Sequence, residues 1–283
     1  MFEQNGSYGH KLILQRYCQV RENLPVWGEI QHSFWAIEPK WKAKHDRYFP
    51  TNFTWNDLLS LPRQVPIGDP WFYLSNCPKT PLNFGEKQVQ LLTRETLSIV
   101  FPQQTGKQES INDKIKRHRE LLETTITLFP NNKVLVFLHP VEESNLTFQN
   151  LYSNYGNQVT VIKRRALDAV YSARLTFEYL NSADAFFTNY QGAHLVRRCL
   201  SGQERTFVMY ETGYFQGASV VIRNLLSELG ISTVEDRVEI AKILLGWKFK
   251  QSKEELASML GFVGIRSFFG PILKSIHNKA IYR

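Results

Sequence analysis

One short segment, residues 133–140 (KVLVFLHP), constrains the fold more than any other part of the chain. It holds five consecutive apolar residues, 134–138, and ends abruptly in His139 and Pro140. An apolar run of this length, flanked by helical patterns, predicts a central strand of a parallel sheet that is buried on both faces. Ligands of open α/β sheets bind at the carboxyl ends of the strands. We therefore expect His139 to lie where a ligand binds, and Pro140 to end the strand there.

Strand and helix patterns alternate from residue 95 to residue 215. The expected strands are 97–102, 133–140, 159–164, 185–189 and 206–212. The expected helices between them are 112–128, 143–155, 168–182 and 191–201. Such alternation requires right-handed crossovers and predicts a parallel sheet of about five strands with helices on both faces.

Two further parts flank this predicted domain. Residues 1–94 contain a helical pattern at 10–20 and short strand patterns near 26–30 and 65–74, which predict a smaller α/β domain. The turn-rich stretch 75–94 is interpreted as the passage into the domain of residues 95–215. Residues 216–283 are predicted to be a helical segment, with helices at 216–229, 233–249 and 252–260; Ser252 followed by Glu255 is a capping-box pattern.

Charge and cysteine content limit the classes of partner. The chain has 34 Lys and Arg against 26 Asp and Glu, a net charge of +8. Apart from residues 163–165 the basic residues are dispersed, so no nucleic-acid stripe is indicated. The three cysteines are far apart, which favours a reducing compartment, and neither a signal-peptide pattern nor a membrane-spanning run is visible. We expect a cytoplasmic protein.

The basic, aromatic stretch 265–283 allows two interpretations. It could dock the protein peripherally onto the anionic inner membrane, or it could pack back against the first domain. We favour packing, in which Phe268 and Phe269 hold a terminal helix against the first domain.

Four segments carry a family resemblance when they are taken together. They are WGEIQHSFW (27–35), VPIGDPWFYL (65–74), VLVFLHP (134–140) and SADAFFTNYQGAHLVRRCLSGQERTFVMYE (182–211). In this combination the chain resembles the GT-B (two-Rossmann-domain) glycosyltransferases of bacterial surface-polysaccharide synthesis. The HP element is similar to that of bacterial sialyltransferase-like enzymes, which use CMP-activated sugars. Two features depart from the family pattern. Ser33 stands where such turns usually have Gly, and the loop after Asn189 reads YQGA (190–193), without the hydroxyl residue that such loops often use to hold a phosphate.

The resemblance implies a GT-B-like fold, with a Rossmann-type second domain and a reduced first domain. It implies a metal-independent, inverting glycosyltransferase that moves a sugar from a nucleotide-activated donor to a surface-polysaccharide or lipid-linked glycan acceptor. The implied donor is a CMP-sugar. The alternatives are a UDP-, GDP- or ADP-sugar donor, or a catalytically inactive subunit that binds a glycan or a partner transferase.

The first domain would provide the acceptor side. An inverting transferase needs a base that takes the proton of the acceptor hydroxyl. Glu29, in an otherwise apolar strand, is the first candidate for this base. An equally supported alternative is that Glu29 lies on an edge strand and points to solvent. His32 is the second candidate for the base. The same resemblance puts Gln31, Ser33 and Asp69 near the acceptor, although Asp69 also suits an ordinary turn.

The second domain would bind the donor nucleotide. An imidazole at a strand end can donate a hydrogen bond to phosphate, and the first-turn amides of a helix can bind one. For His139 the alternative is a hydrogen bond to a backbone carbonyl. Ordinary capping of the following helix by Asn189 is the alternative for that loop. Glu211 could reach a ribose hydroxyl. The donor-side candidates are His139, Pro140, Thr188, Asn189, Gly192 and Glu211.

No Asp-x-Asp motif and no cluster of His and Cys residues occurs in the sequence, so it requires neither a metal nor another cofactor. The charge of the leaving nucleotide would then be stabilised by His139, by helix amides and by nearby basic residues such as Lys107 or residues 163–165.

Overall fold

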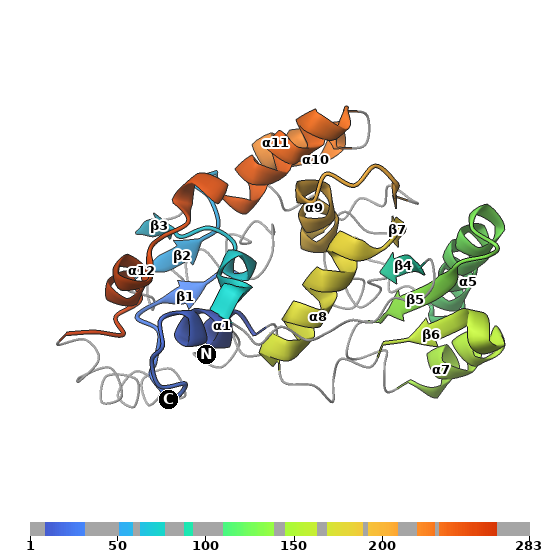
Figure 1. The fold of residues 1–283 in the computed structure, drawn as a ribbon, viewed down its shortest axis with the longest axis horizontal. Coiled ribbons are helices and arrows are strands. Elements are labelled where there is room, and N and C mark those ends of the chain that lie inside the picture. The colour runs from blue at the N-terminus through green and yellow to red at the C-terminus, as the bar shows by residue number, and fades with distance from the viewer. Residues whose placement is uncertain are drawn as a thin grey trace. The chain divides into compact units, whose positions relative to one another are not determined.

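The computed structural model describes residues 9–31, 51–58, 63–76, 88–92, 110–138, 145–162, 169–188, 192–208, 220–229 and 232–264. The chain forms two compact units. The first consists of Met1–Thr80, Ala169–Leu175 and Tyr214–Arg283, and the second of Pro81–Asp168 and Thr176–Gly213. Each unit combines a parallel sheet with helices, which confirms the α/β class expected from the sequence (Figure 1).

The second unit is built on a five-stranded sheet in which every pair of neighbouring strands is parallel. The strand order is β6-β5-β4-β7-β8. The strands are β4 (Gln88–Leu92), β5 (Lys133–Phe137), β6 (Val159–Val161), β7 (Ala185–Thr188) and β8 (Thr206–Val208).

Helices cover both faces of this sheet, as Figure 1 shows. On one face lie α5 (Ile111–Leu128) and α7 (Leu146–Ser153), and on the other lie the second half of α8 (Ala169–Ser182) and α9 (Ala193–Leu200). Alternate residues of β5 serve the two faces: Val134 and Val136 join the core under α5 and α7, whereas the ring of Phe137 meets Tyr179 of α8 edge to face at 5.4 Å. Residues 134–138 are all buried, which confirms the prediction of a strand covered on both sides.

The central strand of the sheet differs from the prediction. Strand β4 comes from the stretch 75–94, which was interpreted as a turn-rich passage. The expected strand at 97–102 lies outside the described residues. The sequence of β4, QVQLL, has two glutamines and therefore lacks the continuous apolar run of a buried strand. Pairing with β5 on one side and β7 on the other fixes it nonetheless.

The first unit contains a three-stranded parallel sheet of order β1-β2-β3. Its strands are β1 (Glu29–Ile30), β2 (Asn52–Thr54) and β3 (Gln64–Pro66), and its helices are α1 (His10–Tyr17), a 3₁₀ helix at Pro70–Asn76, α10 (Val220–Glu228), α11 (Val234–Leu245) and α12 (Lys253–Met259). The capping box of Ser252 and Glu255 at the start of α12 is confirmed. Strand β2 was not expected, because its three residues lie among scattered aromatic and charged residues.

The end of α11 is fastened to the loops that follow β2 and β3. Asn56 Nδ2 donates to the Leu244 carbonyl at 2.6 Å, and the backbone N–H of Asp69 donates to the Leu245 carbonyl at 2.8 Å. The terminal carbonyls of a helix lack intrahelical donors, so these bonds satisfy them. Gly246 follows in the left-handed region (φ 70°), so close to the chain that a Cβ there would lie 1.6 Å from the Trp55 carbonyl oxygen.

We expect Gly246→Ala to destabilise the first unit by about 1–3 kcal/mol more than Gly264→Ala, because only the former drives a methyl group into a backbone carbonyl. Gly264 is the matched control: its φ is also positive (73°), and a Cβ there would meet no described atom within 4 Å, so that variant bears only the left-handed cost of about 1–2 kcal/mol. Urea unfolding followed by tryptophan fluorescence measures both, since all six tryptophans belong to the first unit. Equal losses in the two variants would contradict the close approach.

Candidate functional site

The strand order of the second unit defines a point where the chain changes direction across the sheet. From β4 the chain passes through α5 to β5 on one side, and from β7 it passes through α9 to β8 on the other. Ligands of open α/β sheets bind at such a switch point, outside the carboxyl ends of the strands. In the register of the sheet, Leu92 of β4 pairs with Phe137 of β5 and with Thr188 of β7. The carboxyl ends of these three strands therefore lie in one row, which is the candidate site.

The donor-side candidates follow the strands of this row. Thr188 is the last residue of β7 and is buried, and Gly192 is the N-cap of α9 in extended conformation, with no side-chain hydrogen bond to the cap. The expected capping by Asn189 is not what begins α9, because the N-cap lies three residues further on. His139, Pro140, Asn189 and Glu211 lie outside the described residues; the described chain ends one residue before His139 and one before Asn189.

A buried arginine that sequence reasoning missed holds α9 in place. Arg198 is fully buried, and its guanidinium donates to the carbonyls of Leu180 (2.5 Å) and Ala183 (3.0 Å) at the end of α8. Burial lowers the pKa of Arg198 to about 10, so it remains charged at neutral pH. This link joins the last turn of α9 to the C-terminal end of α8. The only signal in the sequence was a basic pair, Arg197 and Arg198, inside a short amphipathic helix.

Gln31, one of the acceptor-side candidates, makes hydrogen bonds that stabilise the first unit. Its side-chain oxygen accepts from the Trp55 backbone N–H at 2.8 Å, and its own carbonyl accepts from the Trp55 indole N–H at 3.0 Å. Its backbone N–H donates to Phe53 at 2.8 Å, so Gln31 joins the end of β1 to β2. Glu29 pairs through its backbone with Asn52, and its side chain is outside the description, as are His32 and Ser33.

Asp69 occupies a buried turn. Its carboxylate accepts from the Trp71 N–H at 3.2 Å, and its backbone carbonyl accepts from Phe72 at 2.9 Å. These bonds start the 3₁₀ helix at Pro70–Asn76, which is the turn role that the sequence analysis weighed against a place near the acceptor.

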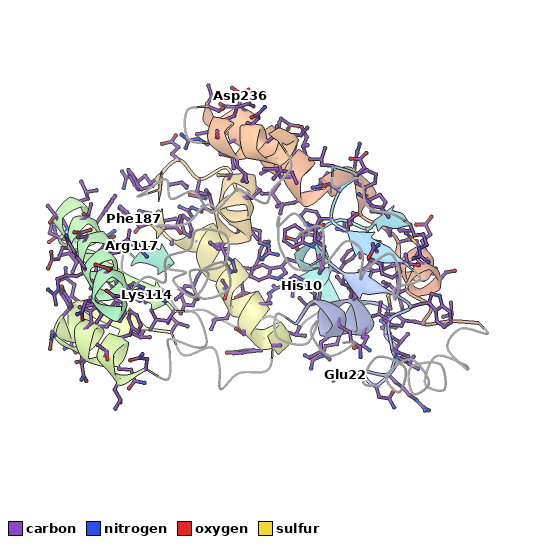
Figure 2. The ribbon with its side chains drawn as sticks, turned by 180° about the vertical axis from the view of Figure 1, so that it is seen from behind. His10, Glu22, Lys114, Arg117, Phe187 and Asp236 are labelled. Atoms are coloured by element: carbon purple, nitrogen blue, oxygen red, sulfur yellow. The ribbon has the colours of Figure 1, made fainter. Side chains whose placement is uncertain are left out.

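Helix α5 places basic groups on its sheet-facing side, where Figure 2 labels Lys114 and Arg117. Lys114 and His118 are both buried, and His118 Nδ1 lies 2.6 Å from the hydroxyl of Tyr152. Burial, reinforced by the positive charges of Arg117 and Lys114, lowers the pKa of His118 to about 3. His118 is therefore neutral throughout the physiological range.

In the described part of the chain, no group of three or more His, Cys, Asp or Glu side chains could hold a metal ion. Within the same residues, no helix has the length and apolar character needed to cross a membrane. A scan of protein-family models finds no match to this chain, and a search of curated proteins finds none either.

We expect the stability of the second unit to fall as the pH drops from about 6.5 to about 3. In that window the unfolded chain protonates His118 and the folded chain does not, so the loss approaches about 1.4 kcal/mol per pH unit. Above pH 6.5 this contribution is constant. His118→Gln should remove this part of the slope. Amide hydrogen exchange at Val134 and Val136, which are buried in β5, measures the stability of the second unit in the wild-type protein and in His118→Gln. If stability depended on pH in the same way in both proteins, a buried neutral imidazole would be excluded.

Proposed function

We propose that this chain is a metal-independent, inverting glycosyltransferase of the GT-B type. In this proposal the second unit is a Rossmann-type domain that binds the nucleotide-activated donor, a CMP-sugar. The first unit binds the acceptor, a surface polysaccharide or a lipid-linked glycan. The proposal rests on the family resemblance of the four sequence segments, and the comparisons add no relative to it.

The observation that supports it best is the row of strand ends at the switch point. Two of the four segments contain strands of this row: segment 134–140 includes most of β5 and segment 182–211 includes β7, and these two strands pair with β4 on either side. The last residues of β5 and β7, Phe137 and Thr188, are far apart in sequence and both pair with Leu92 of β4 at one edge of the sheet. That edge is where an open parallel sheet binds a nucleotide.

Each donor-side residue has a chemical role in the proposal. The phosphate of the leaving nucleotide gains negative charge as the bond to the sugar breaks. His139 donates a hydrogen bond to that phosphate, and the first-turn N–H groups of α9 stabilise the same charge. Thr188 and Asn189 shape the turn, and Glu211 bonds a ribose hydroxyl.

On the acceptor side, Glu29 removes the proton of the attacking hydroxyl, and His32 is the next candidate. No step in this scheme passes through a metal ion. The donor could instead carry UDP, GDP or ADP, and a nucleotide-binding chain that transfers no sugar would be a regulatory or partner-binding subunit. The two experiments below separate these possibilities.

We expect CMP to raise the melting temperature of the protein, whereas UDP, GDP and ADP raise it less. A ligand that binds only the folded state adds about 2.7 kcal/mol at a hundred times its Kd. His139→Ala should weaken CMP binding roughly ten- to a hundredfold, the loss of one charge-assisted hydrogen bond. A larger stabilisation by another nucleotide changes the donor in this proposal; no stabilisation by any of the four contradicts the nucleotide site.

Glu29→Gln should leave the Kd for CMP unchanged and reduce sugar transfer by about 10²–10⁴, the usual share of a general base. His139→Ala, in contrast, should lower both binding and turnover. Calorimetry with CMP beside a transfer assay on both variants distinguishes the two roles. Transfer at the wild-type rate by Glu29→Gln would exclude this base and make His32→Ala the next variant.

A further inference from the structure

A tryptophan lies at the surface of the first unit, directly after helix α11. Trp247 begins a 3₁₀ helix, Trp247–Phe249, that follows the left-handed Gly246, and it is 47% exposed. Tryptophan is highly buried on average in folded proteins, because its large ring gains much from leaving water. An indole that is held in place but left half in water is a candidate for binding a ligand.

The neighbouring side chains hold this indole in position. The ring of Phe72 meets it edge to face, with 4.9 Å between the centroids, and the Lys250 ammonium lies over it at 5.6 Å. Next to them, Lys248 Nζ lies 4.6 Å from the centroid of the Phe249 ring and 3.4 Å from Asp57 Oδ2. We call these residues the indole cluster: Asp57, Phe72, Trp247, Lys248, Phe249 and Lys250.

The indole cluster lies where two parallel strands of the first unit end. Asp57 follows β2 by three residues, and Gly68 follows β3 by two. Gly68 (φ 76°) packs against the cluster: a Cβ there would lie 3.3 Å from the Phe72 ring and 3.5 Å from the Lys250 backbone nitrogen. Ligands of open α/β sheets bind outside the carboxyl ends of the strands. The exposed indole is therefore at the edge of this sheet where a ligand is expected.

The two lysines of the cluster differ in their electrostatic surroundings. Lys248 is paired with Asp57, and both side chains are more than half exposed. Lys250 is exposed too, and none of the carboxylates in the described part of the first unit pairs with it. The cluster thus combines an aromatic ring, a positive charge without a counter-ion, and an exposed carboxylate that can accept hydrogen bonds.

This combination fits an acidic sugar better than a lipid surface. One face of a pyranose ring presents C–H groups, which pack on the negative face of an indole, and its hydroxyl groups can donate to Asp57. A carboxylate on the sugar would pair with Lys250. An anionic bilayer would be repelled by Asp57, and it needs several exposed apolar side chains, whereas Phe72 and Phe249 are half-buried.

We propose that the indole cluster binds an acidic sugar residue of the glycan acceptor. Trp247 packs against the sugar ring, and Lys250 pairs with the sugar carboxylate. This inference rests on the proposed function, in which the first unit binds the acceptor, and it narrows the acceptor to a glycan that carries carboxylates.

Calorimetry with tetragalacturonate and with its neutral methyl ester tests the site, because the ester keeps the sugar rings and removes the charge. We expect the wild-type protein to bind the acid about fivefold more tightly than the ester, the share of an exposed ion pair. Trp247→Ala should weaken binding of both probes roughly tenfold or more. Lys250→Met should weaken binding of the acid alone and so abolish the preference.

Two control variants should bind both probes like the wild-type protein. Val263→Ala removes another exposed apolar side chain of the first unit, and Lys116→Met removes an exposed lysine of the second unit. Urea unfolding shows whether Trp247→Ala is folded. Lys250→Met changes an exposed side chain and tests the site independently of that result.

The outcomes separate this inference from the proposed function. Binding of tetragalacturonate that requires Trp247 and Lys250, in a protein that binds no nucleotide, would support the sugar site and contradict the glycosyltransferase proposal. Nucleotide binding and sugar transfer by a protein that binds neither sugar probe would overturn the inference and leave the proposed function intact. Equal affinity of the wild-type protein for acid and ester would also overturn it. So would binding to phosphatidylglycerol vesicles that is lost in Trp247→Ala, without binding of either sugar probe.

Discussion

The pairing of β4 with β5 and β7 is the constraint on which the candidate site depends. Parallel hydrogen bonds on both sides of β4 align Leu92 with Phe137 and with Thr188. A slip of one residue would turn every side chain of a strand to the opposite face and move the strand ends out of their row. The buried side chains of β5 and β7, which pack under α5 and α7, prevent such a slip. The register of β4 with β5 and β7 therefore determines both the packing of the core and the alignment of the strand ends.

Hydrogen bonds from polar groups hold the helices of both units in place. Arg198, in the last turn of α9, joins that helix to the C-terminal end of α8. The first unit uses a different device: its C-terminal helix α11 is joined by hydrogen bonds to the loops after β2 and β3. The small sheet of the first unit is thereby bonded to a helix almost 200 residues further along the chain.

Much of the architecture could be predicted from the sequence, because long periodic segments determine it. The apolar run of β5, the pattern of α5 and the capping box of Ser252 each have a strong local signature. Strand β4 could not be found in this way, since its glutamines conceal a strand that only its neighbours define. Lys114 was missed for the same reason: a lysine on an amphipathic helix usually lies on the solvated face, and only the fold shows that this one is buried. The sequence motifs predicted site residues after β5 and after β7. Whether those two strand ends lie close together depends on the order of the strands in the sheet, which no local sequence pattern specifies.

The central claim is that a nucleotide phosphate binds at the row of strand ends of β5, β4 and β7. Amide chemical shifts measured by ¹H–¹⁵N NMR during a CMP titration test it most directly. The account predicts the largest shifts at Leu138, Thr188, Gly192 and Ala193, with those amides saturating together at one Kd. Shifts confined to the amino ends of the strands, to α7 or to the first unit would contradict it.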